Sequence, residues 1–398
     1  MKNMHFKLVL IVCIFHSVYS YNVTDEGRLF TDLFSNYNKD LRAGNDRDYP
    51  LNVSMQFYLL AIKEFVEASS KFTVNGVFAI TWRDERLSWD PATYNNITKT
   101  LVFQEKIWIP NIVTVNPFEE AYGLGSNLVQ VNVDNEGSCF WVTMQSFEVI
   151  CDADVTYYPF DKQYCVLKFV AYTLDVDWLN ISFPNSEVTL TNYEESGLWK
   201  IEDTANYCYI EEGSTYVVVG LHLKRRSTYY LASLILPMTV VAILQAFVFV
   251  LPNDSGERVG FSVTILLTSV VFLTIIQEKL PEASEPNISV LGFLLFGYVI
   301  LGALVTLCVI LSANIHSFTE ATHMPKLLRY ICCLQSNIVE GTLSSSSTMK
   351  VASKEEEMEE EPPSCSWNDV AKRFDRFCFI SSLFLYAIQV IIYFGLSA

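Results

Sequence analysis

The stretch Glu257-Arg-Val-Gly-Phe-Ser-Val-Thr-Ile-Leu-Leu-Thr-Ser-Val-Val-Phe-Leu-Thr-Ile-Ile-Gln-Glu278 decides the fold of this chain. It is long and apolar enough to cross a bilayer as a helix, and a carboxylate stands at each end. Steps of three and four residues put one set on a single helix face: Glu257, Gly260, Thr264, Leu267, Val271, Ile275 and Glu278. A face with small, hydroxyl and acidic side chains is suited to water rather than to lipid. The helix therefore indicates a pore wall, or else a buried helix of a membrane bundle with ordinary flanking charges.

Three further apolar runs accompany this helix. They cover residues 231–251, 290–315 and 377–396, and each approaches the length that spans a bilayer. Together with 259–277 they predict a four-helix transmembrane bundle. If the N-terminal half is extracellular, the basic residues of segment 316–376 lie in the cytoplasm, as the positive-inside rule requires. We therefore expect a multi-pass plasma-membrane protein whose N-terminus and C-terminus are both extracellular.

The first twenty residues predict a secretory signal peptide. Lys2 and Lys7 precede the apolar run Leu8–Phe15, and the residues up to Ser20 suit a signal-peptidase site. A first membrane helix is the alternative, but the apolar run is too short to span. The domain that follows is then extracellular, and four of its Asn-X-Ser/Thr motifs are candidate glycosylation sites: Asn22, Asn52, Asn96 and Asn180.

The extracellular half has the pattern of an all-β domain. Asp25–Tyr37 has helical spacing, and from Asn52 to Lys224 short alternating runs are separated by turn signals. We expect a short N-terminal helix followed by a β-sandwich. The expected domains are the signal peptide (1–20), the extracellular sandwich (21–228), membrane helices one to three (229–315), a partly disordered cytoplasmic loop that ends in an amphipathic helix (316–376), and the fourth membrane helix with an extracellular C-terminus (377–398).

Composition narrows the function. The chain has 398 residues and a formal net charge of −17, which argues against a nucleic-acid partner because such partners need a basic surface. Its five histidines form no set with metal-ligand spacing, and no nucleophile–base motif stands out. We expect no enzyme activity, no cofactor and no metal site.

A cysteine-closed loop supplies the resemblance to a known family. Cys151-Asp-Ala-Asp-Val-Thr-Tyr-Tyr-Pro-Phe-Asp-Lys-Gln-Tyr-Cys165 places two cysteines in an extracellular domain, where a disulfide is the simplest reading. With Trp89-Asp90-Pro91, Trp108-Ile-Pro-Asn and Gly256-Glu257-Arg258, the chain resembles the Cys-loop pentameric ligand-gated ion channels. It is most similar to nicotinic acetylcholine receptor subunits of an invertebrate-like or non-alpha type. The resemblance implies a homo- or heteropentamer with related subunits, a transmitter bound between extracellular domains and a pore lined by the second membrane helix.

The pore and its coupling follow from this resemblance. Five copies turn Glu257 and Glu278 into carboxylate rings, which favour permeant cations. Leu267 matches the family's gate leucine, and with Val271 it forms apolar rings that close by dewetting. Arg225 matches the family's pre-membrane arginine and Glu67 the carboxylate that it meets. The loop tip should contact the 279–289 linker, and it consists of Tyr158, Pro159, Phe160 and Asp161. The alternative is that the charged residues, Arg225, Glu67 and Asp161, are ordinary surface charges.

The ligand site departs from the nicotinic pattern. The resemblance gives Trp82 the role of the complementary-face tryptophan, but Val115 stands for the family's first tyrosine and Tyr172 for its tryptophan. The adjacent cysteine pair is missing from Tyr207-Cys208-Tyr209-Ile210. The candidate walls of an amine site are Trp82, Tyr172, Tyr207, Tyr209 and Tyr216, since aromatic faces attract ammonium groups. The alternative is that the tyrosines are ordinary strand aromatics.

Two extracellular cysteines remain, and the resemblance places Cys139 on the complementary face and Cys208 near the tip of the capping loop. They form either an intersubunit disulfide or two free thiols.

Three functional hypotheses follow. The first is a subunit of a cation-selective, neurotransmitter-gated channel for a small-molecule agonist, in contact with membrane lipid. The second is an accessory non-alpha subunit that conducts only in heteromers, or a channel gated by a ligand other than acetylcholine. The third is a surface binding protein that does not conduct.

Overall fold

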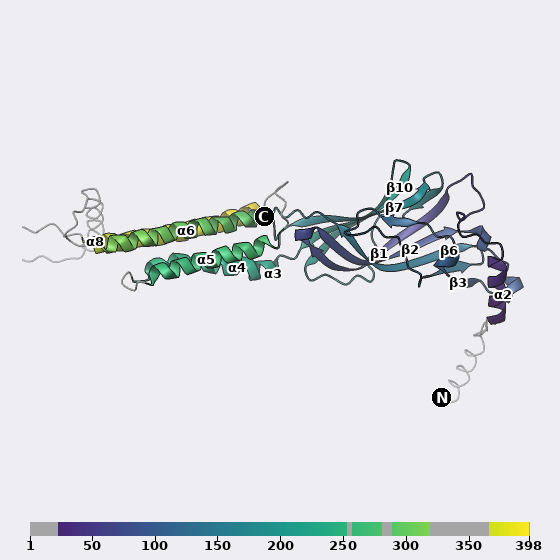
Figure 1. The fold of residues 1–398 in the computed structure, drawn as a ribbon, viewed down its shortest axis with the longest axis horizontal. Coiled ribbons are helices and arrows are strands. Elements are labelled where there is room, and N and C mark those ends of the chain that lie inside the picture. The colour runs from purple at the N-terminus through teal and green to yellow at the C-terminus, as the bar shows by residue number, and fades with distance from the viewer. Residues whose placement is uncertain (1–22, 253–256, 281–288, 319–365, 398) are drawn as a thin grey trace, which may run out of the picture. The chain divides into compact units, whose positions relative to one another are not determined.

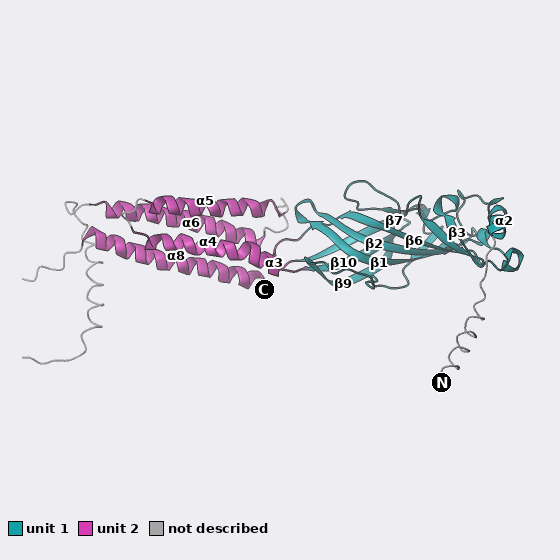
Figure 2. Cartoon of the chain, turned by 90° about the horizontal axis from the view of Figure 1, so that it is seen from below, with its two compact units in different colours: residues 1–153, 162–224 teal, residues 154–161, 225–398 magenta. Residues whose placement is uncertain are grey.

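The computed structural model describes residues 23–252, 257–280, 289–318 and 366–397. The predicted signal peptide, Asn22 and most of the predicted cytoplasmic loop lie outside these residues. The chain divides into two compact units, shown in different colours in Figure 2. The first consists of residues 1–153 and 162–224, and the second of residues 154–161 and 225–398. The tip of the cysteine-closed loop therefore belongs to the same unit as the membrane helices.

The first unit is a β-sandwich with a helix at its N-terminal end (Figure 1). The strands, among the described residues, are β1 (Leu51–Val66), β2 (Lys71–Arg83), β3 (Lys99–Phe103), β4 (Ile112–Thr114), β5 (Gln130–Asp134), β6 (Ser138–Ile150), β7 (Lys162–Asp175), β8 (Leu179–Ser182), β9 (Trp199–Glu211) and β10 (Ser214–Arg225). One sheet has the order β3-β5-β6-β2-β1-β8 and the other the order β4-β7-β10-β9. Short 3₁₀ turns join them: η1 (Glu67–Ser69), η2 (Glu85–Leu87), η3 (Pro91–Tyr94) and η4 (Gln104–Lys106). The predicted sandwich is confirmed.

Alternation of side chains along the strands builds the core. In β6, Cys139, Trp141 and Thr143 point inward, while the residues between them face outward. Four buried phenylalanines from both sheets meet at the centre, with ring centroids 4.8 to 5.8 Å apart and mostly edge-on: Phe57, Phe78, Phe147 and Phe169. Each such ring contributes about 1.5–3 kcal/mol by leaving water.

The N-terminal helix α2 (Val23–Phe34) is amphipathic, as the spacing over residues 25–37 predicts. Asp25 and Glu26 lie in its first turn, where the helix dipole favours negative charge. Leu29 is fully buried, and Phe30, Leu33 and Phe34 also pack against the sandwich core.

Among the described residues, the second unit contains four apolar helices long enough to span a membrane, which confirms the predicted four-helix bundle. The first stretch runs without a break through α3 (Thr228–Tyr230), the π-helical turn η5 (Leu231–Ile235), α4 (Leu236–Phe247) and the 3₁₀ turn η6 (Val248–Val250). The others are α5 (Arg258–Gln277), α6 (Val290–His316) and α8 (Trp367–Ser397). The wide turn precedes Pro237, whose ring removes one backbone donor and crowds the preceding turn. The predicted amphipathic helix and the fourth span form one helix of 31 residues.

Candidate functional site

The predicted pore face of α5 is exposed along its whole length. The seven predicted residues are all exposed: Glu257, Gly260, Thr264, Leu267, Val271, Ile275 and Glu278. Leu267 is 62% exposed and Val271 48% exposed. The Thr264 hydroxyl donates to the carbonyl of Gly260 at 2.8 Å, so its oxygen lone pairs face outward from the helix.

A comparison with α8 shows what kind of neighbour this face needs. Both helices are equally poorly buried by their own bundle. From Phe377 to Leu396 the exposed side chains of α8 are apolar throughout, including Phe377, Ile380, Phe384 and Ile391, which suits contact with lipid tails. The exposed face of α5 instead mixes leucine and valine with glycine, threonine and two glutamates. Acidic groups are costly against lipid, so this face is suited to water or to other copies of α5.

The opposite face of α5 is buried and also carries polar groups, which the sequence analysis missed. Arg258, Ser262 and Ser269 are buried there. The Gln245 amide of α4 donates to the Ser262 hydroxyl at 3.0 Å and to the Thr306 hydroxyl of α6 at 3.3 Å. Arg258, Ser262 and Ser269 are four and seven residues apart, and this helical spacing in the sequence indicates a second polar stripe on α5. Hydrogen bonds to neighbouring helices satisfy polar groups that lipid could not.

The pre-membrane arginine makes a buried ion pair with the loop tip. Arg225 Nε donates to Asp161 Oδ1 at 2.7 Å and Nη2 donates to Oδ2 at 3.0 Å, with both side chains almost inaccessible to solvent. The guanidinium also lies over the rings of Tyr158 and Tyr230. The family resemblance predicts Asp161 in the coupling region but implies Glu67 as the partner of Arg225. Glu67 belongs to the other compact unit, and its pairing with Arg225 stays a prediction.

The loop tip also contacts two membrane helices. The Val290 amide at the start of α6 donates to the carbonyl of Thr156 at 2.9 Å. At the same end of the bundle, near the C-terminal end of α8, the Tyr393 hydroxyl donates to the carbonyl of Tyr158 at 3.1 Å. Phe160 and Phe394 pack edge-on with centroids 6.2 Å apart. Tyr393 was not predicted, because nothing in its local pattern distinguishes it from a lipid-facing aromatic. The loop tip was predicted to contact the 279–289 linker, of which residues 281–288 lie outside the described residues.

The predicted disulfide is present. Cys151 and Cys165 are bonded, with their Cα atoms 5.3 Å apart. It joins the residue that follows β6 to strand β7, and so closes the loop at its base.

Four of the five predicted ligand-site aromatics gather on the outer face of the second sheet. Tyr209 and Tyr216 stack with ring centroids 5.0 Å apart, and Tyr207 lies 6.4 Å from Tyr209. Tyr216 pairs across the strands with Val170, two positions from Tyr172 on the same face. Tyr164, which the sequence analysis did not include, extends this row and stacks on His222 at 4.3 Å. Burial and a hydrogen bond with Tyr207 raise the pKa of Tyr164.

The assignment of Trp82 to the ligand site is wrong. Its side chain is only 2% exposed, because it points inward from β2 and packs edge-on against Trp108 and Trp141. A ring enclosed in the core offers no face to a ligand between subunits. The outward positions of β2 carry no aromatic residue: Asn75, Val77, Ala79, Thr81 and Arg83.

The intersubunit disulfide is also excluded. Cys139 has no exposed surface, and its thiol donates to the carbonyl of Gly137, so it cannot reach a second subunit. Burial raises the pKa of Cys139 and raises that of Cys208 to about 11. Both are free thiols in the structure.

The raised pKa gives a test by alkylation. The thiolate is the reactive form, so Cys208 should react slowly with iodoacetamide at pH 8, and the rate should rise about tenfold per pH unit toward pH 10. Cys139 should stay unmodified until the protein unfolds. Peptide mass mapping measures both, and Cys208→Ser identifies the peptide. A reductant-sensitive ladder of linked subunits that Cys208→Ser abolishes would contradict the assignment of free thiols.

An apolar patch lies on the outer face of the first sheet. It consists of Leu101, Phe103, Phe140, Val142 and Met144, and we call it the β6 patch. Leu101 and Phe140 both pair with Asn132 of β5 and so share one face. Met144 is 71% exposed. An exposed apolar patch of this kind marks an interaction surface.

The described glycosylation candidates are accessible. Asn52, Asn96 and Asn180 are all exposed. Asn52 and Asn180 face each other on the parallel strands β1 and β8, and the Asn180 amide donates to Asn52 Oδ1 at 2.9 Å. Their modification stays a prediction.

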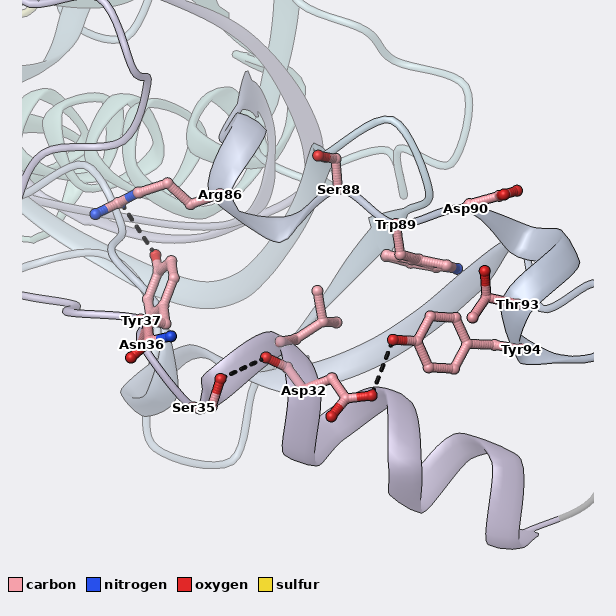
Figure 3. Close-up of a pocket in the computed structure, with 11 residues that line it drawn as sticks. Asp32, Ser35, Asn36, Tyr37, Arg86, Ser88, Trp89, Asp90, Thr93 and Tyr94 are labelled. Carbon is pink, nitrogen blue, oxygen red and sulfur yellow. Dashed lines mark hydrogen bonds between the residues drawn. The ribbon is translucent and has the colours of Figure 1, made fainter.

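A cavity of about 440 Å³ lies between α2 and the sandwich (Figure 3). Figure 3 shows the Tyr94 hydroxyl directed at Asp32, and the Arg86 guanidinium at Tyr37. The Tyr37 hydroxyl also donates to the buried Asp84 at 2.9 Å. Burial of Tyr37 raises the pKa of this hydroxyl. These groups bond to one another, which fastens α2 to the sandwich. In the part of the chain that the structure describes, no cluster of His, Cys, Asp and Glu side chains is arranged to hold a metal ion.

Comparisons with known proteins agree with this geometry. Residues 26–227 match a family described as the neurotransmitter-gated ion-channel ligand binding domain, and residues 234–339 match the corresponding transmembrane region. The acetylcholine receptor subunit alpha-1-A of Xenopus laevis is 31% identical over 82% of this chain and 73% of its own length. The mouse neuronal subunit alpha-6 is 31% identical over 83% and 68%. The beta-type subunit unc-29 of Caenorhabditis elegans is 29% identical over 81% and 66%.

Proposed function

Because the chain belongs to the neurotransmitter-gated ion-channel family, we propose that it is a subunit of a cation-selective pentamer whose pore is lined by the exposed face of α5. The observation that carries the proposal is the chemistry of that face. Glu257 and Glu278 stand at its ends, with Gly260, Thr264 and Leu267 between them, and all are exposed in a single chain. Five copies around an axis convert each glutamate into a ring of five carboxylates.

Such rings select ions by charge. A carboxylate ring at a narrow opening attracts cations and repels anions, and the low dielectric of the surrounding helices strengthens this field. Glu257 lies at the inner end of α5, next to the cytoplasm in the predicted orientation. Together with Leu267, the apolar residue Val271 provides a constriction that excludes water when the pore is narrow.

Replacing Glu257 with alanine, with a proline inserted before it, should shift the reversal potential toward that of chloride. The five carboxylates that dominate the field are then absent. The measurement is the reversal potential in oocytes bathed in successive dilutions of sodium chloride. Glu278→Ala is the matched control at the wide outer end, where solvent screens the charge and a smaller shift is expected. A wild-type sodium-to-chloride permeability ratio after loss of Glu257 would refute the pore assignment.

The agonist is proposed to be a small amine that binds on the tyrosine row of the second sheet. Tyr172, Tyr207, Tyr209 and Tyr216 offer cation–π faces, but tyrosine is weaker in this role than tryptophan. Acetylcholine should therefore be a weak agonist or none. Dose–response recordings with a panel of amines test this, and robust activation at low micromolar acetylcholine would contradict it. Tyr172→Trp should strengthen any response to an ammonium ligand by about 1 kcal/mol, whereas Tyr172→Phe controls for the hydroxyl.

The second candidate, an accessory subunit, is favoured by the absence of any aromatic residue on the outward face of β2. A homomer would build each ligand site from one tyrosine row and a neighbouring β2 strand that carries no outward aromatic residue. The β6 patch is the proposed contact with that neighbour, because its apolar side chains are exposed in the single chain. Expression alone and with a related subunit separates the candidates. Current from the chain alone indicates a complete channel, and current only with the related subunit indicates the accessory role.

A further inference from the structure

A buried ion pair holds the inner end of α5 on the side away from the proposed pore. Arg258 Nη1 donates to Asp375 Oδ2 at 3.0 Å, and Nη2 donates to Oδ1 at 2.7 Å. The Ser312 hydroxyl donates to the same Oδ1 at 2.6 Å. Arg258 is 3% exposed and Asp375 7% exposed. The contact joins α5, α6 and α8, which Figure 2 shows packed in one bundle.

Stability alone is a weak reason for this arrangement. Two charges lose their hydration when they are buried, and a well-packed apolar set of the same volume is often as stable or more stable. Here two guanidinium nitrogens bond to the two carboxylate oxygens in a bidentate pair. The Arg258 guanidinium carbon also lies 5.5 Å from the centroid of the Phe249 ring. What a bidentate pair adds is a fixed direction, since it holds Arg258 in one orientation.

The residue next to Arg258 is the proposed selectivity residue. Consecutive residues on a helix point about 100° apart, so Arg258 faces the bundle while Glu257 faces outward. Glu257 makes no side-chain cap hydrogen bond at the start of α5. Its direction is therefore set by the rotation of the helix rather than by a bond of its own.

The next turn of the same face is also bonded to its neighbours, through the Gln245 amide and Ser262. Farther along, within the described residues, the buried Ser269 hydroxyl bonds only to the carbonyl of Ile265 in its own helix. The bonds between helices thus concentrate at the end of α5 that carries Glu257.

We propose that Asp375 and Ser312 are positioning residues for ion selection: through Arg258 they fix the rotation of α5 and so the direction in which Glu257 faces. The inference rests on the proposed function, in which Glu257 lines the pore. Neither Asp375 nor Ser312 faces the ions, because both are buried in the bundle.

The test compares variants of the whole receptor in oocytes by the sodium-to-chloride permeability ratio, with surface labelling to count receptors. Ser312→Ala removes one hydrogen bond to Asp375 and changes no charge, so any shift in the ratio reports position rather than electrostatics. We expect about a twofold loss of selectivity. Asp375→Asn should lower the ratio about fivefold, equivalent to about 1 kcal/mol. Asp375→Glu, which keeps the charge and can keep the pair, should retain more of the wild-type ratio than Asp375→Asn.

The matched control is Ser269→Ala, which removes a buried serine hydroxyl from the same face but no bond to another helix. It should leave the ratio at the wild-type value. If Asp375→Asn fails to reach the surface, Ser312→Ala decides. Wild-type selectivity in Ser312→Ala and in any Asp375→Asn receptor at the surface, with selectivity lost in Glu257→Ala, would overturn the positioning role alone. Wild-type selectivity in Glu257→Ala would instead refute the pore assignment.

Discussion

Asp161→Asn should abolish most agonist-evoked current. The substitution removes the charge that compensates the Arg225 guanidinium in a site that solvent does not reach. Breaking a buried ion pair by removing one partner costs about 3–5 kcal/mol, because the carboxylate that balances the guanidinium charge is lost. The loop tip would then lose its strongest contact with the start of the membrane helices, and binding of the ligand would no longer be coupled to the pore. The measurement is current per receptor at the surface, with receptors counted by labelling.

Glu202→Gln is the matched control for this change. Like Asp161→Asn, it removes one carboxylate charge from an ion pair. In the structure Glu202 pairs with Lys162 at 2.7 Å, but this pair lies exposed on the second sheet. Nearby lysines hold the pKa of Glu202 below its usual value, yet solvent screens the exposed pair. The agonist-evoked current of Glu202→Gln should stay close to that of the wild type. Exchange of the two charges, Asp161→Arg with Arg225→Asp, should restore part of the lost current. Wild-type current in Asp161→Asn would show that the buried pair plays no part in gating.

Leu267→Ser should produce current without agonist. In the proposed pore, Leu267 forms an apolar ring that water leaves when the pore is narrow, and a hydroxyl at this position lowers the barrier to hydration. Leu267 is the most exposed large apolar residue of α5, so the change creates no buried cavity and should not impair folding. The expected result is a standing current that a pore blocker removes, together with a response to lower agonist concentrations.

The control for Leu267→Ser is a polar change on the opposite face. Ile265→Ser alters a buried residue two positions away and should reduce receptor number rather than open the pore. If Leu267→Ser reaches the surface and gates as the wild type does, the constriction lies at another ring, with Val271 as the next candidate.

Periodicity was sufficient to predict the sandwich, the four spans and the exposed face of α5, because each depends on a local pattern of apolar residues. The cysteine pair at 151 and 165 was equally local. Trp82 was misassigned because β2 alternates, and the sequence alone does not say which alternate set faces the core. Its neighbours Trp108 and Trp141 come from distant parts of the chain and enclose its ring.

The partners of the charged groups were the least predictable part. Arg225 contacts a carboxylate 64 positions earlier, and Arg258 contacts one 117 positions later. Such pairings depend on how the helices pack, which no short pattern encodes. The two acids could nevertheless have been singled out, since a buried carboxylate beside an apolar span needs a cation nearby.

Of the membrane helices, α8 is translated last, although its residues complete contacts with segments made much earlier. Tyr158 leaves the ribosome 235 residues before Tyr393, and Arg258 leaves it 117 residues before Asp375. Until α8 has been translated and inserted, Arg258 at the inner end of α5 lacks its partner Asp375, and an arginine without its carboxylate is costly beside an apolar span. A premature stop codon in α8 would therefore give a product that cells degrade early, even though the codon leaves the ligand domain and the pore helix intact.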